Sequence, residues 1–391
     1  MSSLRPDVPQ LQGGRIVIVG GGVVGLSVAW HLSDQGYTEI TVVERAGIGE
    51  GATAKATGGI RQQFSTDVNI AMSRYGVDFY ARFAERLGEP LVFRQHGYLF
   101  LLDRREQLSP FRAAVGRQRN HGVPARLLAP DEIAELMPAA RTDDLVGASY
   151  CPTDGSASPA DAVAGFARRA RNAGVVICQQ TGVTGIRRNR HGAVSGVDTT
   201  AGGMDAEAIV IAAGPQSAAV AALAGFDAPV EPHSRQAFSI GPLPWLTADL
   251  PLSVDLGSGA YLHPESDGGV IGGADRNAPI SEEARVDWSR TDDLIAALVS
   301  RFPGLADAEV RSGWAGLREM TPDDHALLGP VESVPGLWLA AGFSGHGFMH
   351  APAAGAAVAG LLLTGHSPVD VAALHPGRFA AGRVIEESAV F

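Results

Sequence analysis

The chain carries the sequence RIVIVGGGVVG at residues 15–25. Residues 16–19 form a continuous apolar run after Arg15, a pattern typical of a strand buried on both faces of a parallel sheet. Gly20, Gly22 and Gly25 follow at once with the spacing GxGxxG. The first glycine permits a tight turn, the second lets the backbone approach a pyrophosphate, and the third lets a strand and a helix pack closely. The stretch predicts a strand, a phosphate-binding turn and the start of a helix.

A helix and a second strand complete this unit. Apolar residues with helical spacing extend over 23–35, and a further apolar run covers 39–43. The order strand, helix, strand predicts a parallel sheet. Glu44 ends the second strand, where a carboxylate accepts hydrogen bonds from ribose hydroxyls and disfavours a 2′-phosphate. We expect FAD or NAD here rather than NADP; an ordinary glycine turn is the alternative.

A second glycine-rich turn favours a flavin. Residues 342–347 read GFSGHG and lie between a buried-type strand at 337–341 and a small-residue helix at 348–363. The amides of such a turn and the helix N-terminus are expected to face an anion. A reduced flavin carries negative charge on its ring edge and needs such support. The alternative is a turn that only caps the helix.

Length and composition exclude several classes of protein. The 391 residues are 45% hydrophobic and 19% charged, which excludes a disordered chain or a coiled coil. The net charge of −11 argues against a nucleic-acid or anionic-membrane partner. Cys151 and Cys178 form neither a disulfide framework nor a metal cluster and fit a reducing cytoplasm. Residues 1–14 do not resemble a signal peptide, and the apolar run at 351–363 is too short to span a bilayer.

The rest of the chain alternates between two patterns. A strand is expected at 175–178 and a further buried-type strand at 209–214, whereas residues 229–274 hold short strands with turn residues, as in an antiparallel sheet. Two interleaved domains, each discontinuous in sequence, are the simplest explanation. Further strands are expected at 91–103, 182–187, 194–198, 236–240, 259–263 and 269–273, and helices at 67–87, 108–121, 159–173 and 290–302.

Several motifs together resemble one family. The chain is similar to the D-amino-acid oxidase superfamily of FAD enzymes, within its glycine oxidase and sarcosine oxidase branch. The most specific matches are WAGLREMT at 314–321 and GFSGHGFMH at 342–350. The other matching stretches are 17–25 with Glu44, GATAKATGGIRQQF at 51–64, YCPTDGSASP at 150–159 and IVIAAGP at 209–215. The resemblance therefore covers nearly the whole chain.

The resemblance implies an α/β fold. A Rossmann-like FAD-binding domain of the glutathione-reductase type is interleaved with a substrate domain on a mixed, mainly antiparallel β-sheet. We expect the FAD-binding domain at residues 1–90, 151–228 and 325–391, and the substrate domain at 91–150 and 229–324.

The resemblance also implies a reaction. A hydride passes from the carbon of a C–N bond to the flavin, and water hydrolyses the resulting imine. Our preferred substrate is an N-substituted glycine, which gives glyoxylate and an amine. In the oxidases of this family oxygen reoxidises the flavin and hydrogen peroxide forms. The alternatives are D-amino-acid, glycine or sarcosine oxidation, a dehydrogenase subunit that passes electrons to a partner, and a flavoprotein used for assembly rather than catalysis.

Five residues are expected to surround the substrate. Arg318 matches the arginine that grips the substrate carboxylate in glycine and D-amino-acid oxidases, a task for which its planar fork is suited. Tyr261 matches a tyrosine that helps to hold that carboxylate, and Arg61 matches the carboxylate-binding arginine of sarcosine oxidases. His346 matches the histidine beside the flavin, and Met349 shapes the pocket wall.

These assignments have alternatives. An ion pair of Arg318 with Glu319 or Asp323 would be a purely structural role. If Arg61 and Arg318 both line the pocket, a secondary amine with two carboxylates could be held at both ends.

A larger set of residues is expected to hold FAD. They belong to the first glycine turn, the following loops and the second glycine turn: Gly20, Gly22, Val23, Val24, Gly25, Glu44, Arg45, Ala52, Thr53, Thr57, Gly58, Gly59, Val183, Ala213, Gly214, Gly316, Gly342, Gly345, His346, Gly347, Phe348 and Met349.

The chain departs from the family at four places. Sarcosine oxidases have a lysine at the position of Met349, and monomeric ones attach flavin through a cysteine at the position of Gly316. Gly272 stands about where their oxygen-activating lysine would be, and residues 51–60 lack the flavin-linking histidine of dimethylglycine-type enzymes. We therefore expect non-covalent FAD. Oxygen is the expected electron acceptor, although the missing lysine argues against a fast reaction with it. A cytoplasmic protein that can form homo-oligomers completes the expectation.

Overall fold

A six-stranded sheet forms one half of the molecule. The computed structural model describes residues 11, 13–273 and 280–388. The strand order is β18-β19-β12-β1-β2-β8, parallel except at the edge strand β18. The strands are β1 (Ile16–Val19), β2 (Ile40–Val43), β8 (Val176–Cys178), β12 (Ala208–Ile211), β18 (Leu327–Pro330) and β19 (Leu337–Ala341). β1, β2, β12 and β19 consist almost wholly of apolar residues, and all of their residues are buried, as strands covered on both faces must be.

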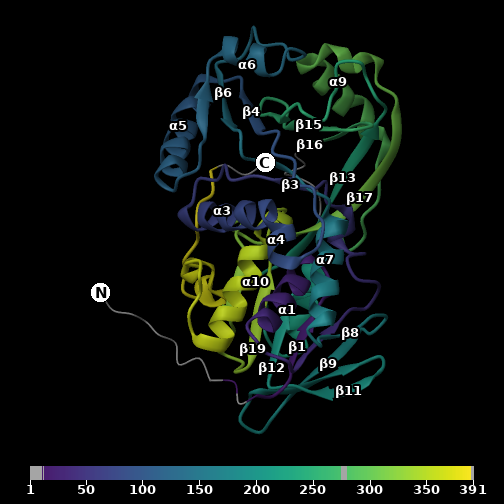
Figure 1. The fold of residues 1–391 in the computed structure, drawn as a ribbon, viewed down its shortest axis with the longest axis vertical. Helices are drawn as coiled ribbons and strands as arrows, with labels where there is room; N and C mark the ends of the chain where they lie inside the picture. Colours follow the sequence, from purple (N-terminus) through teal and green to yellow (C-terminus); the bar gives the residue numbers. More distant parts are fainter. Residues whose placement is uncertain (1–10, 12, 274–279, 389–391) are drawn as a thin grey trace.

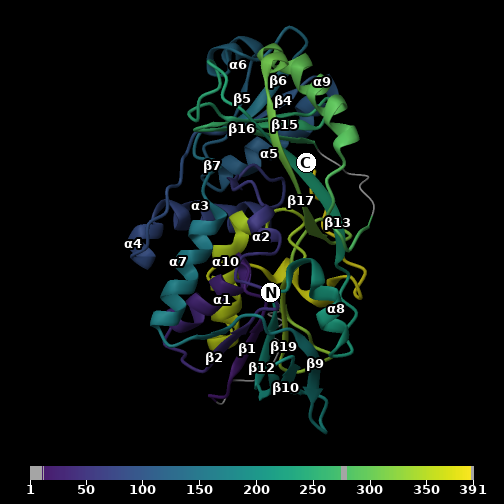
Figure 2. The same ribbon diagram turned by 90° about the vertical axis from the view of Figure 1, so that its right-hand side faces the viewer.

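Helices cover one face of this sheet, and a small sheet covers the other. Ile16 and Ile18 pack into a core with the helices, whereas Val17 and Val19 pack into a separate core on the opposite face. The helices are α1 (Val23–Asp34), α3 (Asp67–Ala81), α4 (Phe83–Leu87), α7 (Pro159–Asn172) and α10 (Gly347–Thr364). The opposite face carries α8 (Ser217–Ala222) and the strands β9 (Val183–Arg188), β10 (Val194–Thr199) and β11 (Gly202–Asp205) (Figure 2).

An eight-stranded sheet forms the other half. Its order is β17-β13-β16-β15-β14-β4-β6-β5, and every pair is antiparallel except β14 with β4. The strands are β4 (Tyr98–Leu102), β5 (Arg126–Leu128), β6 (Gly147–Cys151), β13 (Glu231–Ile240), β14 (Leu252–Asp255), β15 (Ala260–Glu265), β16 (Gly268–Gly273) and β17 (Val310–Met320). The helices of this half are α5 (Arg105–Asn120), α6 (Pro130–Leu136) and α9 (Thr291–Arg301). The long strands β13 and β17 extend from this sheet toward the other half (Figure 2).

The two halves are interleaved in sequence, as predicted. Strands of the six-stranded sheet come from the beginning, the middle and the end of the chain, and the eight-stranded sheet fills the two intervals between them. Figure 1 shows the two sheets one above the other, with α3 lying between them. A mixed α/β fold is confirmed, while the exact domain boundaries stay predictions.

Two expected elements differ from the structure. The helix expected at 67–87 is broken at Arg82 into α3 and α4, and the break lets Phe83, 1% exposed, pack against Phe79 and Phe166. The strand expected at 91–103 is reduced to β4. It begins only after Gly97, whose φ of 85° lies outside the range that a strand uses.

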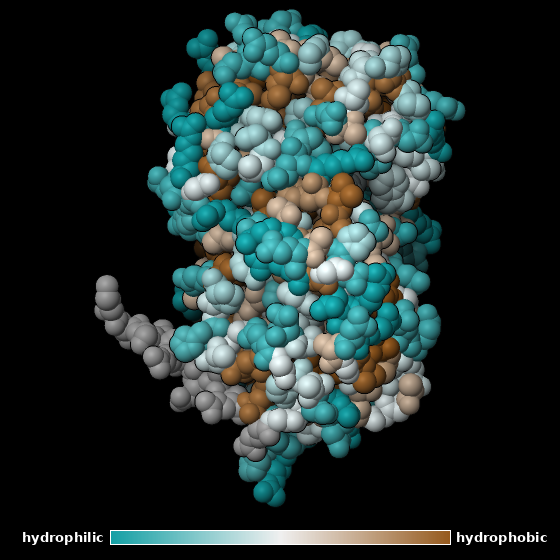
Figure 3. All heavy atoms as spheres, viewed as in Figure 1, coloured by the Kyte–Doolittle hydropathy of each residue, from teal (hydrophilic) through white to brown (hydrophobic). Residues whose placement is uncertain are grey.

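The C-terminal apolar run forms a longer helix than expected. α10 has 18 residues and is apolar enough to cross a membrane by length and composition, but 78% of it is buried inside the protein. It packs along α1, where Gly355 leaves no room for a side chain because an added Cβ would lie 2.3 Å from Ser27 Oγ. The face drawn in Figure 3 shows apolar atoms in separate small groups among polar ones. α10 is therefore a core helix of the half that contains the six-stranded sheet.

Candidate active site

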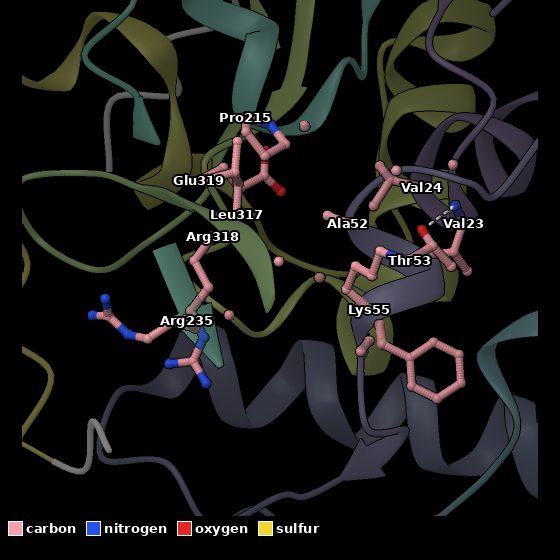
Figure 4. A pocket seen from close by; sticks show the side chains of 18 of the residues that line it. Val23, Val24, Ala52, Thr53, Lys55, Pro215, Arg235, Leu317, Arg318 and Glu319 are labelled. Carbon is pink, nitrogen blue, oxygen red and sulfur yellow. Dashed lines mark hydrogen bonds between the residues drawn. The ribbon is translucent and has the colours of Figure 1, made fainter. Parts of the chain in front are cut away.

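A cavity of about 760 Å³ lies where the two halves of the molecule meet. Its wall combines the turn after β1, the end of β2, α2 (Ala52–Lys55) and the start of α10 with residues of β13, β14, β15 and β17. All five residues expected around the substrate line it, as do all of those expected to hold FAD except Gly25 and Gly342. Figure 4 shows α2 on one side of the cavity and Arg235 and Arg318, from β13 and β17, on the other.

The first glycine turn has the shape that a pyrophosphate requires. Gly20 has a φ of 115°, and a Cβ there would lie 2.2 Å from the carbonyl oxygen of Ala212. Gly25 does not face the cavity because it allows α1 to approach the turn; a Cβ there would lie 2.0 Å from Gly20 O. The N-terminus of α1 points into the cavity, and its Val23 amide donates to Thr53 Oγ1 at 3.2 Å. Only glycine fits at these positions, as predicted for a dinucleotide-binding turn.

Glu44 lies at the end of β2, beside this turn. Its Oε2 accepts from the Gly21 amide and its Oε1 from the Ala46 amide, both at 2.8 Å. These two bonds fix the carboxylate at the cavity wall, and each oxygen keeps a lone pair for a ribose hydroxyl. Together with the close-packed glycines, this carboxylate fits the adenosine half of FAD.

The second glycine turn differs from expectation in its first part. The Gly342 amide donates to Glu319 Oε2 at 3.0 Å, and the Ser344 amide donates to Glu319 O at 2.9 Å. The group that the start of this turn faces is thus the protein's own Glu319 carboxyl and not a ligand, and Gly342 does not line the cavity. Burial raises the pKa of Glu319 to about 7. Gly345, His346 and Gly347 do line the cavity and can face a ligand.

Arg318 offers its guanidinium to the cavity. Within the described ranges it forms no hydrogen bond and no ion pair. The structural alternative is not formed: Asp323 binds Arg378 through two bonds of 2.7 and 2.9 Å, and Glu319 points away from Arg318. Gly345 has a φ of 93° and packs directly on the guanidinium. A Cβ atom added at Gly345 would lie only 3.1 Å from Arg318 Cζ. A half-buried cation that has no partner among the described residues suits an anionic ligand.

Two tyrosines accompany Arg318. Burial raises the pKa of Tyr261 to about 12, and the charge of Arg318 opposes this shift. Burial likewise raises the pKa of Tyr98 to about 12, against the charges of Arg61 and Arg318. Both phenols therefore stay protonated and can donate hydrogen bonds to a carboxylate.

Arg61 is deeply enclosed, with 4% of its surface exposed. It donates from Nη1 to Gln63 O at 2.5 Å and from Nη2 to His346 Nε2 at 3.2 Å, and its guanidinium lies 3.9 Å from the centre of the Phe64 ring. Since arginine only donates, Nε2 of His346 accepts, and we assign the imidazole proton to Nδ1. Burial holds the pKa of His346 well below its usual range, and the charge of Arg61 adds to this effect. His346 is therefore neutral, as expected for a lining residue.

Sequence reasoning missed several lining residues: Tyr98, Lys55, Arg235, Gln236 and Trp314. Tyr98 had a signal, because it begins the alternating stretch that forms β4. Trp314 donates from Nε1 to Lys55 O at 3.0 Å and so fixes α2 against β17. Gly316 makes this contact possible, since a Cβ there would lie 2.6 Å from Lys55 Cβ. A cysteine at 316 would therefore collide with Lys55.

The chain resembles known flavoenzymes along nearly its whole length. The family described as DAO, FAD dependent oxidoreductase, matches residues 15–361. Sarcosine oxidase subunit beta of Rhodobacter capsulatus is 28% identical over 380 residues, which cover 95% of this chain and 90% of that protein. Dimethylglycine dehydrogenase of Rattus norvegicus is 28% identical over 383 residues, but the chain spans only 44% of its length.

Solved structures agree with this relationship. L-proline dehydrogenase from P. horikoshii superposes with a TM-score of 0.90 at 31% identity, covering 97% of this chain and 100% of that one. Glycine oxidase from Geobacillus kaustophilus superposes with a TM-score of 0.83 at 27% identity, covering 93% and 98%. The fold, the glycine cradle and these relatives lead to one assignment: the chain belongs to the DAO family of FAD-dependent oxidoreductases, enzymes that act on amino acids and amines.

Proposed function

We propose that the protein oxidises the C–N bond of an N-substituted glycine to glyoxylate and an amine. The observation that carries this proposal is the guanidinium of Arg318, which lines the cavity between the two sheets and has no hydrogen-bond or ion-pair partner among the described residues. Tyr261 lies close enough for its pKa to respond to the charge of Arg318. An arginine fork and a phenol together bind a carboxylate and fix the carbon next to it. Bound non-covalently, FAD supplies the chemistry by accepting a hydride from that carbon.

The residues around the carboxylate site suggest how the amine is handled. His346 is neutral, and the substrate half of the cavity contains the positive charges of Arg61 and Arg318. Positive charge disfavours an ammonium group, so the substrate is expected to react as the neutral amine. Hydride transfer then needs no general base, and water completes the reaction by hydrolysing the imine.

Arg61 has a narrower role in this proposal than that of a second carboxylate anchor. Its Nη atoms already bind Gln63 O and His346. We propose that Arg61 orients His346 and adds positive charge, while substrates with two carboxylates remain the alternative. If Arg61→Ala weakens the binding of a dicarboxylic N-carboxymethyl amino acid much more than that of sarcosine, the alternative holds.

The electron acceptor defines a second candidate function. A lysine at 272 would need the space that the ring of Tyr261 occupies, because even a Cβ at Gly272 would lie 2.5 Å from that ring. The protein thus has no room for such a cation while Tyr261 keeps its place. This favours a dehydrogenase that passes electrons to a partner over a fast oxidase that makes hydrogen peroxide. Oxygen as acceptor, a cytoplasmic location and homo-oligomers stay predictions.

The test is anaerobic reduction of the bound flavin. Purified protein is mixed with sarcosine, glycine, N-carboxymethyl amino acids, D-alanine and L-proline, and loss of the visible flavin absorbance is followed. N-substituted glycines are expected to reduce the flavin fastest, and admission of air then separates oxidase from dehydrogenase. Arg318→Ala is expected to raise the substrate concentration for half-maximal reduction roughly 100-fold, since two charge-assisted hydrogen bonds are lost.

The matched control lies on the same strand. Arg311 of β17 is exposed and pairs with Asp267 outside the cavity, so Arg311→Ala is expected to leave the reduction rate unchanged. A flavin that none of these amines reduces refutes the proposal, as does an Arg318→Ala variant that behaves like the Arg311→Ala control.

A further inference from the structure

Gly272 occupies the place directly against the ring of Tyr261. The two residues lie opposite each other on the antiparallel strands β16 and β15. A Cβ atom added at Gly272 would lie 2.5 Å from each of Cε1, Cζ and the hydroxyl oxygen of Tyr261. Real Cβ atoms do not approach other atoms so closely. The ring therefore rests where a side chain at position 272 would stand.

The backbone does not require a glycine at this position. The φ of Gly272 does not lie in the left-handed region, so residues with a side chain can adopt the same backbone conformation. On its other side Gly272 faces Ala237 of β13. Residues directly opposite each other on neighbouring strands share a face of the sheet. The missing side chain at 272 and the small one at 237 leave room for the phenol ring to lie across β16, and Trp314 of β17 stands opposite Ala237 at the end of this row.

The position of the ring matters because Tyr261 and Arg318 stand on different strands. β16 and β13 separate β15 from β17. At the usual spacing of about 4.8 Å, strands three steps apart are about 14 Å apart. Arg318 also stands four residues along β17 from Trp314, the residue in the row of Tyr261, so the two side chains must reach both across the sheet and along it. A ring that lies across β16 carries its hydroxyl toward β17, whereas a ring that stands upright on β15 does not.

We infer that Gly272 is a positioning residue of the carboxylate site: by lacking a side chain it lets the ring of Tyr261 lie across β16, with the hydroxyl directed toward Arg318. The inference rests on the proposed function, because it concerns the same carboxylate site. The atoms that an added Cβ at position 272 would displace belong to the far end of the Tyr261 side chain, which moves more easily than backbone. Alanine at 272 would therefore shift the hydroxyl of Tyr261 and leave the strands and Arg318 in place.

The test uses the FAD-loaded protein with acetate as a carboxylate probe. An anion that binds beside the flavin changes its visible spectrum, so a titration gives a Kd for acetate without turnover. Gly272→Ala is expected to raise this Kd at least tenfold, and so is Tyr261→Ala. Because Gly272 acts through Tyr261, the double variant is expected to bind acetate no more weakly than Tyr261→Ala alone.

A glycine that does not line the cavity provides the control. Gly116 of α5 lies outside the cavity wall, and a Cβ there would meet no other side chain within 4 Å. Gly116→Ala is therefore expected to keep the wild-type Kd. An unchanged Kd in Gly272→Ala overturns the inference, and so do losses that simply add in the double variant.

A crystal structure of Gly272→Ala gives a readout that does not depend on acetate. The ring of Tyr261 must be displaced, and an unmoved ring overturns the inference. If the ring is displaced but the wild-type flavin spectrum does not respond to acetate, the proposed carboxylate site fails while the steric role of Gly272 stands. Should Gly272→Ala fail to fold, adding Tyr261→Ala is expected to restore folding because the obstructing ring is gone. Failure of that rescue overturns the inference as well.

Discussion

Replacing Glu319 with glutamine is expected to stabilise the protein at alkaline pH. The carboxyl of Glu319 is enclosed between β17 and the second glycine turn, and burial raises its pKa from 4.5 to about 7. In the unfolded chain the group ionises near pH 4.5, whereas in the folded protein it stays neutral up to about pH 7. Above pH 4.5 the folded state must either hold an unfavourable charge or keep a proton that the unfolded state has released.

The size of the effect follows from the shift. Each pKa unit corresponds to about 1.36 kcal/mol, so ionised Glu319 lowers the free energy of unfolding by about 3 kcal/mol once the pH exceeds 7. At pH 4 the carboxyl is neutral in both states and costs nothing. Glutamine keeps an oxygen that can accept from the Gly342 amide and never ionises. The stability advantage of Glu319→Gln is therefore expected to be near zero at pH 4 and to grow to about 3 kcal/mol at pH 8.

Urea unfolding followed by tryptophan fluorescence at several pH values measures this difference. Other titrating groups act on wild type and variant alike and cancel when the two curves are subtracted. Glu309, exposed just before β17, gives a control, since Glu309→Gln is expected to follow the wild type at every pH. If wild type and Glu319→Gln keep a constant separation from pH 4 to pH 8, the carboxyl is not held in the environment described.

Two further predictions concern folding and cofactor binding. Arg378→Met is expected to lower the free energy of unfolding by about 3–5 kcal/mol, because it leaves the buried Asp323 carboxylate without the arginine that binds it. Calorimetry would show this as a large loss of Tm. A loss of Tm no greater than that of Arg311→Met, a control at an exposed ion pair, contradicts the prediction. Gly25→Ala is expected to bind no FAD and therefore to be colourless, because its Cβ would lie 2.0 Å from Gly20 O. The control Gly116→Ala has open space around the new atom and is expected to stay yellow. A yellow Gly25→Ala protein with normal FAD content contradicts this prediction.

The parts of the fold that depend on neighbouring residues could be predicted from the sequence. The order β1, α1, β2 follows from apolar runs, helical spacing and the glycine turn, all within about 30 residues. Residues from family motifs, such as Arg318 and His346, were also predicted, and the structure brings them to one cavity. Their roles there stay proposals.

The contacts between distant segments could not be predicted in this way. Gly342 was expected to face a ligand, but it faces Glu319, which lies 23 residues earlier in the chain. From the sequence, Glu319 had been a possible ion-pair partner of Arg318. The break at Arg82 depends on Phe166, which α7 brings from far along the sequence. Such pairings are decided by packing between elements, and no local pattern of residues records them.

The interleaving of the two halves has a consequence for synthesis. Strand β1 and helix α1 are made first, but α10, which covers α1, begins only at Gly347. At about 5–20 residues per second, a ribosome needs roughly 15 to 60 s to translate the intervening segment. During that time the apolar surface of the first βαβ unit lacks its final cover. The nascent chain is therefore expected to need a chaperone for most of its elongation.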